Sequence, residues 1–122
     1  GIDIISSYKR ASNILDSELK DKKFELSNTT DPGIFKTELE KNLFKKINEL
    51  RKYFQSINKD ENFEQSLTNL ADSKKVVFDF FDNVTVNDED PVIKKNRLEL
   101  IKMLCKTFQN FINFQLLKAN NE

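Results

Sequence analysis

The residues of this chain whose types and spacing could bind a ligand have basic or amide side chains. They fall into two groups, each within one stretch of helical periodicity. The six candidates, five of them basic, are Lys9, Arg10, Asn13, Lys94, Lys95 and Arg97. Lysine and arginine donate strong hydrogen bonds to anionic oxygens, and an asparagine amide both donates and accepts. Both groups therefore suit contacts with an anionic, hydrogen-bonding partner.

The same inventory leaves little for catalysis. The chain has no histidine, which removes the commonest acid–base side chain and the usual zinc ligand. Cys105 is the single cysteine, so no internal disulfide or Cys-rich metal cluster can form. The two glycines are Gly1 and Gly33, so a glycine-rich phosphate loop is missing. We expect no catalytic residue, no cofactor and no metal site within this chain.

An acidic cluster precedes the second basic group. Its five carboxylates are Asp79, Asp82, Asp88, Glu89 and Asp90. A calcium loop requires another spacing and a glycine that this segment lacks. We therefore interpret Asp90 as a helix cap before Pro91. Asp79 and Asp82 are expected to face solvent or to pair with Lys75.

Four amphipathic segments predict an all-α fold. Apolar residues recur every three or four positions over about 3–19, 34–57 and 61–84, and again from residue 91 onward. Polar links separate these segments, and the Asp31-Pro32 and Asp90-Pro91 pairs are helix-start or turn signals. A single domain over residues 1–122, built as a four-to-five-helix bundle, is the expected architecture.

Each candidate residue also has a plainer interpretation. Residues 91–118 carry six bases and one acid, so Lys94 and Lys95 could simply line a solvated helix face. Arg97 could be structural, because it could reach the acidic end of the preceding helix. Ser12 and Asn13 are poor choices for a buried helix interior, which favours a polar role there.

Several aromatic residues lie off or at the edge of the apolar stripes. They are Phe44, Tyr53, Phe80 and Phe114. An exposed aromatic ring can stack on an unpaired base. In a chain with eleven phenylalanines, packing in a wide core is the plainer explanation. Tyr8 falls on its stripe and is expected to pack.

Charge and hydropathy restrict the class of protein. The formal net charge is zero, which argues against a free-standing, non-specific nucleic-acid binder. No apolar run approaches the roughly 20 residues of a membrane span, and no secretory signal is visible. We therefore expect a cytoplasmic location and no membrane partner.

Two phrases of the sequence resemble a known family. Residues 80–84 read Phe-Phe-Asp-Asn-Val, residues 89–91 read Glu-Asp-Pro, and residues 96–101 read Asn-Arg-Leu-Glu-Leu-Ile. Residues 8–15 read Tyr-Lys-Arg-Ala-Ser-Asn-Ile-Leu. Taken in their order along the chain, the phrases resemble the C-terminal anticodon-binding region of the β subunit of the bacterial two-subunit glycyl-tRNA synthetase. Ile101 stands where that family has a leucine.

The resemblance implies a role without chemistry. The whole enzyme would use ATP and magnesium to charge tRNA with glycine, with catalysis on a separate α subunit. This chain would be a C-terminal fragment of a longer β chain, monomeric by itself. Its partners would be tRNA, the α subunit and the remainder of the β chain. In the related domain of arginyl-tRNA synthetase the first helix lies beside the anticodon loop, which favours Lys9, Arg10 and Asn13 as contacts.

A helical protein-binding adaptor or bacterial surface antigen is the alternative, because low glycine content and balanced charge suit it equally well. The two hypotheses predict different surfaces. An RNA-binding module should gather Lys9, Arg10 and the bases of the last helix on one surface. An adaptor should expose a contiguous apolar patch.

Overall fold

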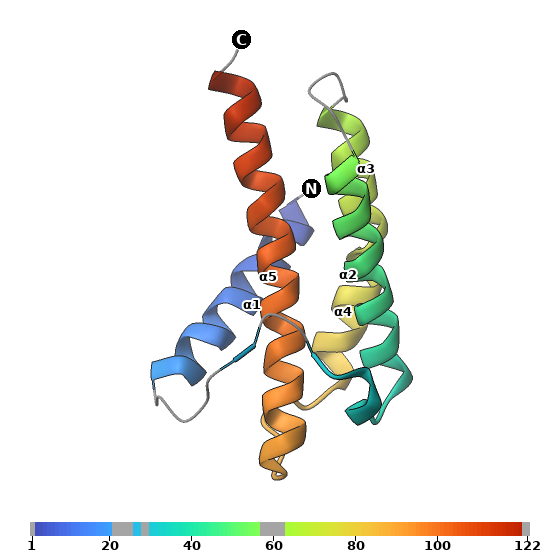
Figure 1. Cartoon of the computed structure of the whole chain (residues 1–122), viewed down its shortest axis with the longest axis vertical. Coiled ribbons are helices and arrows are strands. Elements are labelled where there is room, and N and C mark those ends of the chain that lie inside the picture. The colour runs from blue at the N-terminus through green and yellow to red at the C-terminus, as the bar shows by residue number, and fades with distance from the viewer. Residues whose placement is uncertain (1, 21–25, 28–29, 57–62, 121–122) are drawn as a thin grey trace.

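The computed structural model describes residues 2–20, 26–27, 30–56 and 63–120. Within this part, the chain forms five α-helices and one short 3-10 helix, and no strand. The helices are α1 (Ile2–Lys20), α2 (Glu38–Ser56), α3 (Phe63–Asp72), α4 (Lys74–Asn83) and α5 (Pro91–Asn120), with η1 (Pro32–Ile34) before α2. The predicted all-α fold is confirmed (Figure 1).

α5 is the central helix of the bundle. It packs against both α1 and α2, while α4 packs against α2 and α1 (Figure 1). Every residue from 96 to 101 is buried, so α5 contacts the protein on more than one side. Leu98 and Leu104 lie on the apolar stripe that the periodicity predicts from residue 91 onward, and both are buried. Leu100 and Met103 lie off that stripe and are buried as well. A helix surrounded by neighbours loses the polar face that a surface helix keeps.

The core is aliphatic and aromatic, as the composition predicts. Its fully inaccessible apolar residues are Ala11, Leu43, Ile47, Val77, Phe80, Leu98, Leu100, Ile101 and Leu104. Phe44 packs edge-on against Phe35, with ring centroids 5.5 Å apart. Packing therefore accounts for Phe80 and Phe44, two of the off-stripe aromatics. The side chain of Phe114 lies outside the described part of the chain.

The helix predicted for residues 61–84 is two helices, α3 and α4, so that prediction was wrong. The Ser73 amide donates to the Leu70 carbonyl at 3.0 Å, and the Ser73 hydroxyl donates to the same oxygen at 2.5 Å. That carbonyl would accept from Lys74 in a continuous α-helix. A serine side chain that competes for backbone groups can interrupt a helix in this way.

α2 begins at Glu38, four residues after the predicted start. The Glu40 amide donates to the Thr37 hydroxyl at 3.2 Å, and the Glu40 carboxylate accepts from the Lys36 amide at 2.9 Å. This reciprocal arrangement resembles a capping box. The Thr-x-x-Glu pattern at residues 37–40 was the signal that could have fixed this boundary.

Candidate nucleic-acid interface

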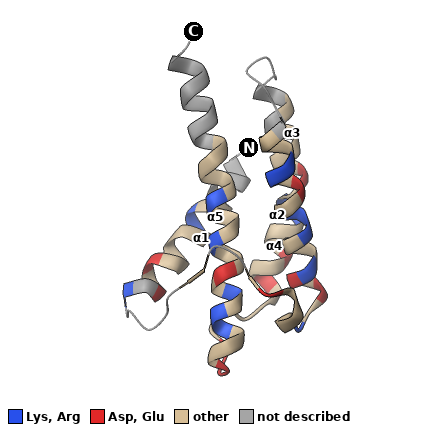
Figure 2. Cartoon of the chain, in the orientation of Figure 1, with Lys and Arg blue, Asp and Glu red and all other residues tan. Residues whose placement is uncertain are grey.

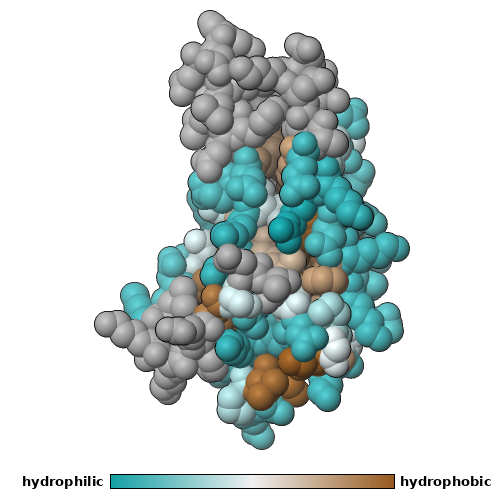
Figure 3. Space-filling view, viewed as in Figure 1, coloured by the Kyte–Doolittle hydropathy of each residue, from teal (hydrophilic) through white to brown (hydrophobic). Residues whose placement is uncertain are grey.

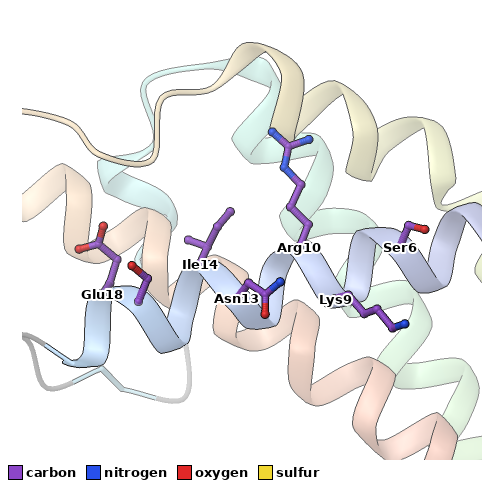
Figure 4. Close-up of a pocket in the computed structure, with 7 residues that line it drawn as sticks. Ser6, Lys9, Arg10, Asn13, Ile14 and Glu18 are labelled. Carbon is purple, nitrogen blue, oxygen red and sulfur yellow. The ribbon is translucent and has the colours of Figure 1, made fainter.

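The outward side of α1 brings three candidate residues together. A shallow hollow of about 570 Å³, open to solvent, is lined by Ser6, Lys9, Arg10, Asn13, Ile14, Ser17 and Glu18 (Figure 4). A second hollow of about 590 Å³ shares two of these residues and is lined by Asn13, Asp16, Ser17 and Lys20. With a rise of 1.5 Å per residue, the two together extend roughly 20 Å along the helix. We call this surface the α1 face.

Lys9 and Asn13 are the exposed polar residues at the centre of the α1 face. They are four positions apart, so they lie on the same side of the helix, one turn from each other. Figure 4 shows both side chains extending from α1 away from the side on which Arg10 reaches toward α4. The arrangement presents a cation beside an amide that can donate and accept, which is the chemistry needed for a phosphate and a base edge.

Arg10 extends from the same hollow toward α4 (Figure 4). Its Nη1 lies 3.7 Å from Oδ1 of Asp82, and its Nη2 donates to the Phe81 carbonyl at 3.4 Å. The guanidinium carbon also lies over the Phe81 ring, 5.0 Å from the centroid. The side chain nevertheless remains 55% exposed, so Arg10 is held in place and still accessible.

Lys94 is joined to the end of the α1 face by an ion pair. Its Nζ lies 2.9 Å from Oε2 of Glu18, and both side chains are mostly covered, at 18% and 23% exposure. Since Glu18 lines the first hollow, Lys94 sits at its border and offsets the charge of that carboxylate. Asp16 adds a second carboxylate to the α1 face, in the lining of the second hollow. Lys95, the next residue of α5, is exposed.

Arg97 is buried and directed into the protein. Its Nε donates to Oε1 of Glu40 at 2.6 Å, and its Nη1 donates to the Thr85 carbonyl at 2.5 Å and to Asp88 at 3.3 Å. The side chain is 7% exposed. This placement supports the structural interpretation of Arg97 over an RNA contact.

A polar strip on α5 holds the segment before η1, a feature that sequence reasoning did not find. The Asn96 amide group accepts from the Asp31 amide at 2.7 Å and donates to the Asp31 carbonyl at 3.0 Å. The Glu99 carboxylate accepts from both the amide and the hydroxyl of Ser27. Lys102 donates to the Leu26 carbonyl at 3.0 Å.

The remaining titratable residues of interest have structural roles. Burial, and secondarily the carboxylate of Asp16, raises the pKa of the Cys105 thiol from 9.0 to about 12. A thiol with that pKa is not an activated nucleophile at neutral pH. Asp90 accepts from the Val92 amide at 2.9 Å, which confirms it as the cap of α5. Lys75 pairs with Asp79 at 3.8 Å, also as expected.

Tyr8 packs as predicted. Its ring meets Phe108 edge-on with centroids 5.6 Å apart, and its hydroxyl donates to Gln109 at 2.9 Å. Among the described residues, no three Asp, Glu or Cys side chains are grouped as a metal ion would require. No helix of the described part is long and apolar enough to cross a membrane.

The surface of the described residues is mainly polar. Val92, 58% accessible, is the one exposed large hydrophobic residue in that part of the chain. Figure 3 shows hydrophilic residues over most of the described surface on this side, with a small apolar area near the lower end. Basic and acidic residues alternate along α2, while the lower half of α5 is mainly basic (Figure 2). The described surface thus lacks the large contiguous apolar patch expected of an adaptor.

Comparison with known proteins assigns the family. The model of the DALR anticodon binding domain matches residues 4–120. The glycine–tRNA ligase beta subunit of Rickettsia bellii (strain OSU 85-389) is 37% identical over 117 residues, which are 96% of this chain and 16% of that protein. The same subunit of Rickettsia prowazekii (strain Madrid E) is 32% identical over 114 residues, or 93% of this chain and 16% of that protein. The chain thus spans about one sixth of the length of these relatives. Since the family model covers nearly all of it, the chain belongs to the DALR anticodon binding domain family.

Proposed function

We propose that this chain is the tRNA-binding module of a glycine–tRNA ligase β subunit and that its α1 face contacts the anticodon loop. Family membership supports the class of ligand. The observation that supports the site is the hollow that Lys9, Arg10 and Asn13 share on α1. Single-stranded RNA loops are commonly recognised through unstacked bases, which such an open polar surface could receive.

The residues of the α1 face would divide the task. Lys9 is a compact point charge, suited to a phosphate of the RNA backbone. Asn13, one turn away, would hydrogen-bond a base edge and so contribute to specificity. Lys94 would add positive charge at the border, shared between RNA and Glu18. Lys95, the exposed residue that follows it on α5, would be a further basic contact.

Catalysis would take place elsewhere in the enzyme. The sequence has no glycine-rich loop for ATP phosphates, and the described residues lack a carboxylate group suited to magnesium. The described residues therefore do not fit ATP and magnesium, and we assign both to the α subunit. Binding here, in the cytoplasm, would orient the tRNA so that its acceptor end reaches that subunit. The remainder of the β chain would connect the two.

Binding of a tRNA with an altered anticodon loop tests this proposal. The expected result is that the chain binds a tRNA-Gly transcript and protects its anticodon loop from single-strand nuclease. A transcript with a replaced anticodon loop and the same stems should bind at least tenfold more weakly. Equal affinity for both transcripts would contradict anticodon recognition. No binding to either, with the fold intact by circular dichroism, would contradict RNA binding by this chain.

A further inference from the structure

We infer that Arg10 presents a fixed guanidinium plane on which an unpaired RNA base stacks, and that it is not a phosphate ligand. The inference rests on the proposed function, because it names how one residue of the α1 face would engage the RNA. It follows from the contacts that Arg10 makes with the end of α4. Among the contacts described, neither Lys9 nor Asn13 makes one of this kind.

The Arg10 guanidinium lies against an aromatic ring. The Arg10 guanidinium carbon lies over Phe81, 5.0 Å from the ring centroid. Phe81 is 7% exposed and its ring also meets Phe80 edge-on, with centroids 5.6 Å apart. The ring is therefore part of the core, and it provides a rigid support for the arginine plane.

Two of the guanidinium nitrogens are also engaged. Nη2 donates to the Phe81 carbonyl at 3.4 Å, and Nη1 lies 3.7 Å from Oδ1 of Asp82. These contacts direct two donor groups toward α4. The Asp82 carboxylate also neutralises part of the positive charge with which Arg10 would attract a phosphate.

The exposed part of the guanidinium is the part left for a ligand. Arg10 lines the hollow of the α1 face and its side chain is 55% exposed. Arginine planes stack on unpaired bases, and a plane fixed beforehand loses less conformational freedom on binding. A base entering the hollow would complete a stack of base, guanidinium and Phe81 ring.

Substitution with lysine separates stacking from phosphate binding. Arg10→Lys keeps the positive charge but removes the plane, so a stacking role predicts that it weakens binding of a tRNA-Gly anticodon stem-loop about 5- to 100-fold, much as Arg10→Ala does. The slope of log affinity against log salt should not change in either variant. Lys9→Ala is the matched control and should lower that slope by about 0.7, because it removes a phosphate contact.

Abasic RNA locates the stacked base. Stem-loops carrying one abasic site at each loop position are tested against the wild-type chain and Arg10→Ala. At one loop position, removing the base should weaken binding to the wild type as much as Arg10→Ala weakens binding of the intact RNA. The abasic RNA at that position should bind Arg10→Ala no more weakly than it binds the wild type. Thermal melts followed by circular dichroism show whether each variant is folded. If Arg10→Ala is destabilised, Arg10→Lys still tests the stacking role.

The possible outcomes distinguish this inference from the proposed function. If Lys9→Ala weakens binding while Arg10→Lys binds like the wild type, Arg10 is a charge contact and the inference is wrong. A fall of about 0.7 in the salt slope of Arg10→Ala would lead to the same conclusion. If neither position affects binding, the α1 face is not the interface and the proposed site is wrong as well.

Discussion

Arg97 on α5 donates to Glu40 in the first turn of α2 at 2.6 Å, although 57 positions separate them in the chain. Their side chains are 7% and 1% exposed. The same guanidinium reaches the Thr85 carbonyl and Asp88, in the segment between α4 and α5. One buried cation thus holds two helices and the α4–α5 connection together, with hydrogen bonds that satisfy the Glu40 carboxylate.

Replacing Arg97 with methionine should destabilise the chain strongly. The substitution retains most of the side-chain volume but leaves the Glu40 carboxylate buried without its cation. Breaking one partner of a buried ion pair costs about 3–5 kcal/mol, a large part of a typical stability of about 5–15 kcal/mol. Urea denaturation followed by circular dichroism measures the change in free energy of unfolding.

An exposed ion pair on α2 provides the control. Lys41 lies 3.4 Å from Glu38, and both side chains are more than half exposed. Lys41→Ala should therefore change stability by less than about 1 kcal/mol. An Arg97→Met variant as stable as Lys41→Ala would show that the buried network contributes little.

Replacing Asn96 with alanine should release the segment around Thr30 and Asp31. The Asn96 side chain satisfies the Asp31 amide and carbonyl, and the Thr30 hydroxyl lies 2.6 Å from its oxygen. Loss of these partners should cost about 1–3 kcal/mol. Hydrogen exchange of the Asp31 amide should become faster. Asn110→Ala, at an exposed site on the same helix, should affect neither quantity.

The helices could be predicted from the sequence because helix formation depends on residues only a few positions apart. Apolar periodicity placed α1, α2 and α5, and the Asp90-Pro91 pair gave the start of α5 at the correct residue. The break at Ser73 was not predicted, because serine is common within helices and its hydroxyl can either face solvent or compete for a carbonyl. Periodicity alone does not distinguish these cases.

The candidate site was predicted less completely, for a physical reason. The grouping of Lys9, Arg10 and Asn13 follows from helical spacing, so the sequence shows it. The partners of Arg97 and Asn96 are tens of positions away, and a side chain's burial depends on how helices pack. The proposed RNA contacts at Lys94 and Lys95 stay predictions. Residue 57, the predicted end of the second helix, lies outside the described residues.

Cys105 should be nearly inert toward thiol reagents in the folded chain. Burial and Asp16 favour the neutral thiol, which raises its pKa to about 12. At pH 8 its thiolate fraction should therefore be far below that of an ordinary cysteine of pKa 9.0. Maleimide labelling at pH 8 should therefore be slow in buffer and fast in urea. Asp16→Asn should increase the rate modestly, and equal rates in buffer and urea would contradict the shift.

The same pKa shift fixes the direction of a pH effect on stability. Because the folded pKa lies above the unfolded value, the stabilising contribution of the neutral thiol is fully present below about pH 9. It is lost progressively as the pH rises from about 9 to about 12, where the unfolded chain ionises first. Cys105→Ser should show a smaller loss of stability over this range than the wild type.

The affinity of the chain for tRNA-Gly after removal of Lys9 and Asn13 tests the central claim most directly. The double variant Lys9→Ala/Asn13→Ala removes the two exposed polar groups at the centre of the α1 face, and Asn42→Ala/Lys45→Ala removes the same residue types from an exposed part of α2. Losing one charge-assisted and one neutral hydrogen bond should weaken binding at least tenfold, since the first alone contributes about 1.5–3 kcal/mol. The α2 variant should bind within about twofold of the wild type, because its substitutions lie outside the proposed interface. Wild-type affinity in the α1 variant, with its helical content unchanged, would contradict the account.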